Sequence, residues 1–119
     1  MQDFTKLKVW QKAHSFTVNL YRITKDFPND EKFGLTNQIR RASVSIESNI
    51  SEGCGRNGDK EFSRFLDIAQ GSAYEVKCQI LIARDLGYLD SSKSQLLTEK
   101  IDEVSRMINA LNQKLRAKS

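Results

Sequence analysis

The sequence contains little proline, cysteine and histidine, and each scarcity excludes a kind of structure or chemistry. Pro28 is the only proline among 119 residues, so most of the chain can form long, uninterrupted elements. Two cysteines, Cys54 and Cys78, cannot supply a disulfide framework, which indicates a reducing compartment and predicts a cytoplasmic protein. His14 is the only histidine and no spacing of metal ligands is recognisable, so we expect neither a metal nor a cofactor.

Long apolar runs are missing as well. No stretch of about 18 apolar residues is present, and the charged first segment "MQDFTKLKVWQK" lacks the apolar core of a secretion signal. We therefore expect no membrane partner. Hydrophobic residues make up 39% of the chain and charged residues 29%, which is the balance of a folded globular protein. The length predicts one domain over residues 1–119.

Apolar residues recur at alternating spacings of three and four over most of the chain, the pattern of helices that pack side by side. Four such patterns predict helices at about residues 6–26, 35–53, 59–86 and 91–116. No segment alternates in polarity for long enough to predict a strand. The connections are short, and short connections make consecutive helices antiparallel neighbours. We predict an all-α fold, an antiparallel up-down-up-down four-helix bundle.

The stretch "GCGRNG", Gly53 to Gly58, matches the G-x-G-x-x-G fingerprint of dinucleotide-binding proteins. That fingerprint works only after a β-strand, where the turn directs a helix N-terminus at the pyrophosphate. Here a predicted helix precedes it, so we interpret the glycines as a helix connection. Gly53 or Gly55 is expected to close the second helix in the left-handed conformation, and Gly58 to cap the third, with Glu61 reaching back to free amides.

No set of residues specifies a reaction. Nucleophilic catalysis needs a nucleophile, a base and an orienting group. Cys54 and His14 fall in the same half of the predicted bundle, but no motif links them. Asp102 and Glu103 are adjacent and point in different directions on a helix, and no Glu-x-x-His motif of a di-iron bundle occurs. We predict that the protein is not an enzyme.

The up-down topology predicts that one end of the bundle carries both termini and most of the excess positive charge. Nine basic residues fall at this end, against five acidic ones, for a net charge of +4. These candidate nucleic-acid-binding residues are Lys6, Lys8, Lys12, Arg56, Lys60, Arg64, Lys114, Arg116 and Lys118. Clustered cations of this kind bind RNA or DNA phosphates. Alternatively the end is a solvated surface whose last lysines complement a helix C-terminal dipole.

The third predicted helix is apolar outside its main seam as well. Either it is the most enclosed helix of the monomer, or it presents a second face to another subunit. Arg40 and Arg41 lie in the middle of the second helix, where they could pair with Glu47, Glu75 or Glu103, or cross a subunit interface. The candidate oligomer-interface residues are Trp10, Arg40, Arg41, Ile68, Tyr74 and Ile82.

Four segments together resemble the 23S rRNA-intervening-sequence proteins, a family of bacterial four-helix bundles. The segments are "FTKLKVWQKAH", "FPNDEKFGLTNQIRRASVSI", "SNISEGCGRNGDKEFSRFLDIAQGSAYE" and "ARDLGYLD", and the resemblance covers about residues 4–112. The accessory variability proteins of diversity-generating retroelements look like relatives of this family. Those proteins form ring-shaped homopentamers that bind a reverse transcriptase and nucleic acid. The resemblance therefore implies a homopentamer. One departure is Glu47, where the family commonly has a proline in the second helix.

Two hypotheses remain. The first is a non-enzymatic, oligomeric bundle that binds RNA or DNA through the basic end carrying both termini. The alternative is a protein–protein scaffold or accessory subunit, for example of a reverse transcriptase, with no direct nucleic-acid contact. Salt distinguishes the two, because phosphate binding weakens steeply as salt rises and an apolar interface barely responds.

Overall fold

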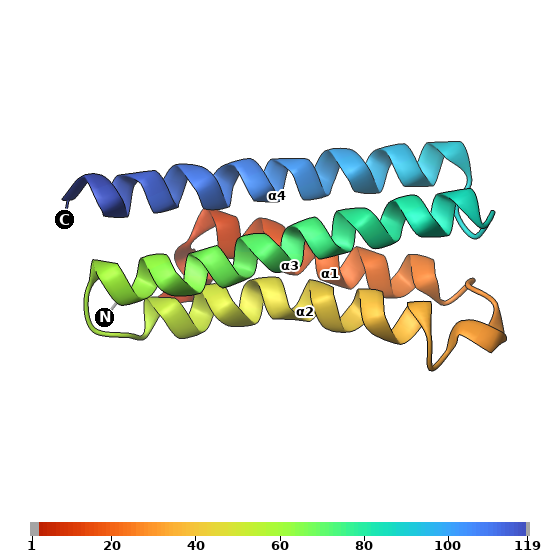
Figure 1. The fold of residues 1–119 in the computed structure, drawn as a ribbon, viewed down its shortest axis with the longest axis horizontal. Helices are drawn as coiled ribbons and strands as arrows, with labels where there is room; N and C mark the ends of the chain where they lie inside the picture. The colour runs from red at the N-terminus through yellow and green to blue at the C-terminus, as the bar shows by residue number, and fades with distance from the viewer. Residues whose placement is uncertain (1–2, 119) are drawn as a thin grey trace.

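The structure, a computed structural model, describes residues 3–118. Its elements are η1 (Phe4–Lys6), α1 (Lys8–Thr24), η2 (Asn29–Glu31), α2 (Leu35–Cys54), α3 (Asp59–Asp85) and α4 (Ser91–Lys118), where η denotes a short 3-10 helix. The helices run side by side in a molecule of 45 × 23 × 20 Å (Figure 1). α3 lies between α2 and α4, and α1 contacts α2 and α4. The predicted all-α, antiparallel four-helix bundle is confirmed.

The helix ends follow from local backbone chemistry. α1 begins at Lys8 rather than near Lys6, because Leu7 is extended and the carboxylate of Asp3 caps the separate turn η1. α1 ends shortly before Pro28, whose ring cannot continue a helix. No helix among residues 3–118 is long and apolar enough to cross a membrane.

In and beside the connection between α2 and α3, three residues differ from the prediction. Neither Gly53 nor Gly55 is left-handed, since Gly53 lies within α2 and Gly55 has φ −84°. The positive φ, 93°, falls on Gly58, directly before α3. Glu61 does not reach back to cap α3 either, because its carboxylate bonds Arg64 instead. The expected left-handed closure and capping box are therefore wrong.

Gly53 allows α2 and α3 to approach closely just before their connection. A Cβ atom on Gly53 would lie 2.7 Å from the Cβ of Phe65 and 3.0 Å from Cδ1 of Phe62. Contacts that short do not occur between real side chains. The glycine is therefore required by helix packing and not by a turn.

The core runs the length of the bundle and draws on every α-helix. Its largest side chains, at most 1% exposed, are Leu20, Ile39, Ile46, Ile50, Leu66, Ile80, Leu97, Ile101 and Ile108. Burying each such side chain contributes roughly 1.5–3 kcal/mol to folding. α3 is packed on two sides, yet its outward face leaves Ile68 and Ile82 more than 40% exposed. Packing within the monomer therefore accounts for only part of the apolar surface of α3.

Candidate nucleic-acid interface

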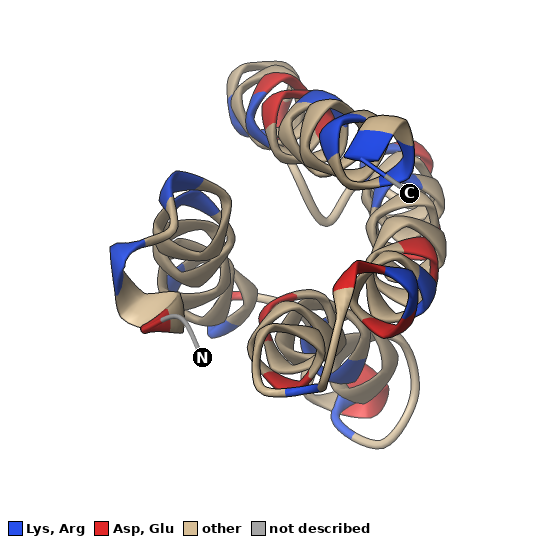
Figure 2. Ribbon diagram, turned by 90° about the vertical axis from the view of Figure 1, so that its left-hand side faces the viewer, with Lys and Arg blue, Asp and Glu red and all other residues tan. Residues whose placement is uncertain are grey.

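The end of the bundle that carries both termini collects lysines and arginines from several elements. Figure 2 looks at this end and shows basic residues on η1, on the start of α1 and on the last turns of α4. At the connection between α2 and α3 basic and acidic residues are mixed. The predicted basic residues thus differ in their electrostatic surroundings, and the ion pairs show how.

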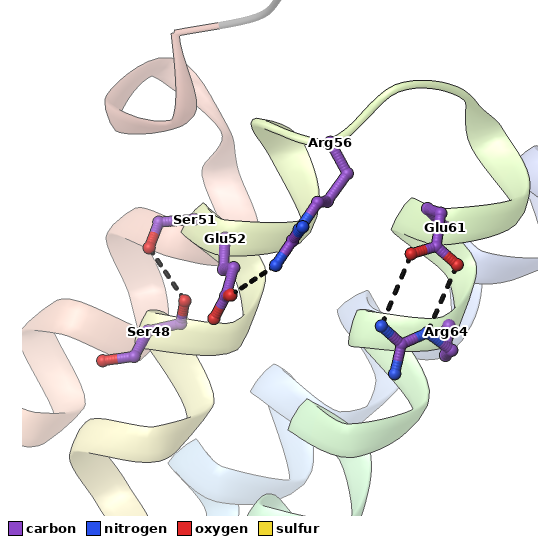
Figure 3. Close-up of polar contacts among 6 residues, drawn as sticks. All are labelled: Ser48, Ser51, Glu52, Arg56, Glu61 and Arg64. Atoms are coloured by element: carbon purple, nitrogen blue, oxygen red, sulfur yellow. Dashed lines mark hydrogen bonds and ion pairs between the residues drawn. The ribbon is translucent and has the colours of Figure 1, made fainter.

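Two arginines of the predicted set are paired with carboxylates beside the α2–α3 connection (Figure 3). Arg56 Nη2 lies 2.8 Å from Oε1 of Glu52, one helical turn earlier. Arg64 Nε lies 3.3 Å from Oε2 of Glu61, and this bond is the main reason why the pKa of Glu61 is lowered. Both guanidinium groups also cover the ring of Phe65. Both ion pairs are about half exposed, so each arginine has a partner within the protein but still faces solvent.

A third arginine joins α3 to α4. Arg116 Nη2 donates to both carboxylate oxygens of Asp67, at 2.9 and 3.0 Å, and its Nε donates to the hydroxyl of Ser63. Ser63 also bonds the buried side chain of Asn112, which in turn donates to Asp67 across 2.8 Å. This network gives Arg116 a structural role in holding the two longest helices together.

The remaining lysines are different, because five of them form no ion pair with any described residue. They are Lys6, Lys8, Lys60, Lys114 and Lys118. Lys12 lies 3.6 Å from Glu103 of α4, and both side chains are about half exposed. Exposed pairs of this kind contribute about 0–1 kcal/mol, so Lys12 remains available to a partner.

Several of these lysines line hollows that follow one another along the α1–α4 side of the bundle. Three adjoining hollows, of about 500, 260 and 310 Å³, share Lys8 between the first and second, and Lys114 between the second and third. We call them together the lysine groove. Its basic residues are Lys8, Lys12, Lys100, Lys114, Lys118 and Arg56, against the acidic residues Glu103 and Asp59.

The residues that line the groove differ in part from the predicted nucleic-acid-binding residues. Of the predicted residues, Lys6, Lys60, Arg64 and Arg116 do not line it. Lys100 does line it, although it is not among the predicted residues. The cause is the unequal length of the helices, since α1 has 17 residues and α4 has 28, which sets the middle of α4 beside the first turns of α1. The predicted helix ranges carried this signal, because residues 91–116 form a longer segment than residues 6–26.

The predicted oligomer-interface residues do not form one surface. Ile68, Tyr74 and Ile82 lie exposed on α3, whereas Trp10 packs against Phe4 on the side of α1 that faces α2. Arg40 acts within the chain, donating to the hydroxyl of Thr24 at 2.8 Å and to the carbonyl of Tyr21 at 3.1 Å. Arg41 is exposed in a shallow hollow that Glu75 also lines.

The two residues weighed for catalysis lie apart. His14 bonds Glu47, with Nδ1 2.7 Å from Oε2, and its ring stacks on Trp10. Cys54 is buried in the core beneath the α2–α3 connection. Within residues 3–118 no three acidic, cysteine or histidine side chains are grouped so that they could hold a metal ion.

Comparison with known proteins agrees with this architecture. The model of the 23S rRNA-intervening sequence protein family matches residues 5–110. The chain belongs to this family. A crystal structure of a protein with unknown function from the S23 ribosomal protein family of Bacteroides thetaiotaomicron VPI-5482 superimposes with a TM-score of 0.82. The two sequences are 23% identical, over 88% of this chain and 95% of the other, so the likeness shows the fold alone. No curated protein sequence matches the chain.

The family match and the solved structure show the fold of the chain and name no binding residue. α2 runs unbroken from Leu35 to Cys54, and Glu47 lies within it. The candidate site must therefore be judged from this chain's own surface, and the lysine groove is its most basic feature.

Proposed function

We propose that the lysine groove binds the phosphate backbone of RNA or DNA. The observation that supports this proposal is the run of six basic residues along three adjoining hollows. Four of these residues form no ion pair with a described residue, namely Lys8, Lys100, Lys114 and Lys118. Lysines that repel one another across a hollow are stabilised by an anion. A polyanion that follows the groove contacts all of them at once and releases its own counterions.

The start of α3 adds to the same surface. Gly58 precedes α3 without a side-chain cap, so the first amides of the helix receive no hydrogen bond from a capping side chain. Gly58 and Asp59 line the hollow that also contains Arg56, Lys114 and Lys118. Helix N-termini carry a partial positive charge and favour phosphate. The amides extend the positive potential of the groove around the end of the bundle.

The experiment is a salt titration of binding, followed by fluorescence anisotropy with a labelled structured RNA and a matched DNA duplex. Phosphate contacts make the logarithm of the association constant fall with the logarithm of salt concentration, by about 0.9 per contact on B-DNA. Replacing Lys100 and Lys114 together by Glu is expected to weaken binding about tenfold or more and to lower this slope by about 2.

A matched control changes the same charge elsewhere. Lys32 and Lys93 lie exposed at the opposite end of the bundle, and the pair Lys32→Glu with Lys93→Glu alters the net charge equally. If the control weakens binding as much as the groove variant, the effect is one of overall charge and the groove assignment is wrong. If the wild-type protein binds neither ligand at low salt, the proposed function is wrong.

A second role is favoured by the outward face of α3. Ile68, Tyr74 and Ile82 are exposed there, and Gly71 between them has open space where a side chain would lie. A glycine in an exposed helix interior costs about 1 kcal/mol relative to alanine, and close approach of another helix accounts for it. We infer that this face contacts a second protein chain, in the first place another copy.

Light scattering tests this inference. A homo-oligomer has a mass several times the 13.6 kDa of the chain, and Ile68→Lys with Ile82→Lys is expected to reduce it to the monomer. A wild-type mass of 13.6 kDa at micromolar concentration contradicts self-association and leaves an accessory subunit with a different partner.

A further inference from the structure

A second groove, of about 750 Å³, lies on the side of α1 that faces α2, whereas the lysine groove lies on its α4 side. We call it the aromatic groove. The residues that matter for the argument are Phe4, Trp10, His14, Tyr21 and Glu47, with Arg22 and Lys25 farther along α1. Carbon atoms dominate its lining, yet it holds one acidic and two basic side chains.

Aromatic rings form the wall at one end. The rings of Trp10 and His14 are stacked, with centroids 4.8 Å apart and planes inclined by 9°. Phe4 meets Trp10 edge-on at 5.1 Å, which fixes the indole. Farther along, the guanidinium group of Arg40 lies over the ring of Tyr21, 4.6 Å from the ring centre. His14 and Tyr21 are exposed and Trp10 is half-buried, and fixed aromatic faces of this kind are surfaces on which unpaired nucleobases stack.

A buried carboxylate with spare accepting capacity lies beside these rings. Glu47 is only 8% exposed, and its Oε2 bonds Nδ1 of His14. Its Oε1 is buried and accepts no hydrogen bond from a described residue. Buried polar atoms are nearly always hydrogen-bonded, because an unpaired one loses its hydration without compensation. A ligand whose N–H donors displace the atoms that cover Oε1 removes this deficit.

Two cations complete the set. Arg22 and Lys25 line the groove and form no ion pair with a described residue. A nucleotide has a part for each of these features. Its flat ring suits the aromatic wall, its N–H donors suit Glu47, and its negative charge suits Arg22 and Lys25. An apolar protein segment would use the carbon lining but neither the carboxylate nor the cations.

We propose that the aromatic groove binds an unpaired guanine nucleotide. Guanine is selected because its ring N1–H and exocyclic amino group are adjacent donors that suit a carboxylate, whereas adenine and cytosine offer the amino group alone and uracil a single N–H. The base lies against Trp10 and His14, and the phosphate lies toward Arg22 and Lys25. This proposal rests on the proposed function, since it supplies base recognition beside the phosphate contacts of the lysine groove.

The experiment uses Trp10, the only tryptophan of the chain, as the reporter. Guanosine 5′-monophosphate is titrated into the full-length protein and compared with inosine 5′-monophosphate, which lacks only the exocyclic amino group. The guanine nucleotide is expected to quench Trp10 fluorescence and to bind about tenfold more tightly, as a bidentate contact implies. A single-stranded oligonucleotide with one guanine, against the same strand with inosine, shows whether the base is taken from a strand as well.

Variants test each part of the groove. Glu47→Gln is expected to abolish the preference for the guanine nucleotide over the inosine nucleotide, because one acceptor oxygen becomes a donor. The control Glu99→Gln, at an exposed position of α4, is expected to leave the preference unchanged. Arg22→Gln with Lys25→Gln is expected to bring the affinity of the nucleotide down to that of unphosphorylated guanosine. The comparison of guanine with inosine on the wild-type protein stands even if a variant does not fold.

The outcomes separate this proposal from the proposed function. Salt-dependent binding through the lysine groove, without quenching or guanine preference, overturns the guanine site and leaves the proposed function intact. Guanine-selective quenching without binding of RNA or DNA duplexes supports the site and overturns the lysine groove. A Trp10 signal that depends on protein concentration and ignores nucleotides identifies the groove as a contact between copies, which overturns the guanine site.

Discussion

The phenol of Tyr88 donates a hydrogen bond to Oε2 of Glu31 across 2.8 Å, which joins the α1–α2 connection to the α3–α4 connection. The other oxygen of the same carboxylate accepts the backbone N–H of Leu35 at 3.1 Å, at the first turn of α2. The bond from Leu35, and then that from Tyr88, lower the pKa of Glu31. The same hydrogen bond to Glu31 raises the pKa of Tyr88.

This pair predicts a pH dependence of stability. Because the pKa of Glu31 is lower in the folded protein than its ordinary value of 4.5, its stabilising contribution is fully present above that value. The contribution is lost as pH falls through the lowered pKa. Tyr88→Phe removes one cause of the shift, so the variant is expected to lose less stability than the wild type on acidification. Urea unfolding at about pH 7 and about pH 3 measures the difference, with Tyr74→Phe, an exposed tyrosine, as control.

Two glycines are expected to respond to alanine in opposite directions. Gly53→Ala places a methyl group 2.7 Å from the Cβ of Phe65, and overpacking of this kind costs about 1–3 kcal/mol. In the monomer, Gly71→Ala adds its methyl group in open space within α3, where alanine is better than glycine by about 0.5–1 kcal/mol. Denaturant unfolding of both variants measures the changes. A stabilised Gly53→Ala variant contradicts the close approach of α2 and α3.

The network between α3 and α4 predicts a cost for losing Asn112. Its side chain accepts from Ser63 and donates to Asp67, so Asn112→Ala leaves a buried hydroxyl and a carboxylate short of one partner each. We expect the free energy of unfolding to fall by about 1–3 kcal/mol. Asn109→Ala, an exposed change on the same helix, is expected to stay within about 0.5 kcal/mol of the wild type.

The core makes a further prediction. Leu66 is fully buried where α3 packs between its neighbours, and Leu66→Ala is expected to cost about 2–5 kcal/mol because it removes apolar burial and leaves a cavity. Leu96→Ala, at 43% exposure, is expected to cost far less. Thermal unfolding followed by circular dichroism compares the two, and equal losses contradict the assignment of the core.

The helices were predictable because their apolar residues repeat with a helical period that no other element satisfies. The start of α3 was also predictable. The role of Gly53 was not, because this residue of α2 is required to be glycine by side chains of α3. Lys100 was not predicted because a charge count by helix end ignores unequal helix lengths. The bond between His14 and Glu47 joins residues 33 apart in the chain, and neither residue belongs to a motif that announces the other.

The short first helix has a consequence for the motions of the bundle. With 17 residues, α1 spans about 25 Å, whereas α4 with 28 residues spans about 42 Å. α1 also makes fewer contacts with α2 and α4 than α3 makes with the same two helices, so its opening requires the least free energy. Its amide hydrogens are therefore expected to exchange before those of α3. Because α1 forms one wall of both grooves, a ligand that orders it from one side slows exchange on the other side as well, which couples the two grooves without any change of shape.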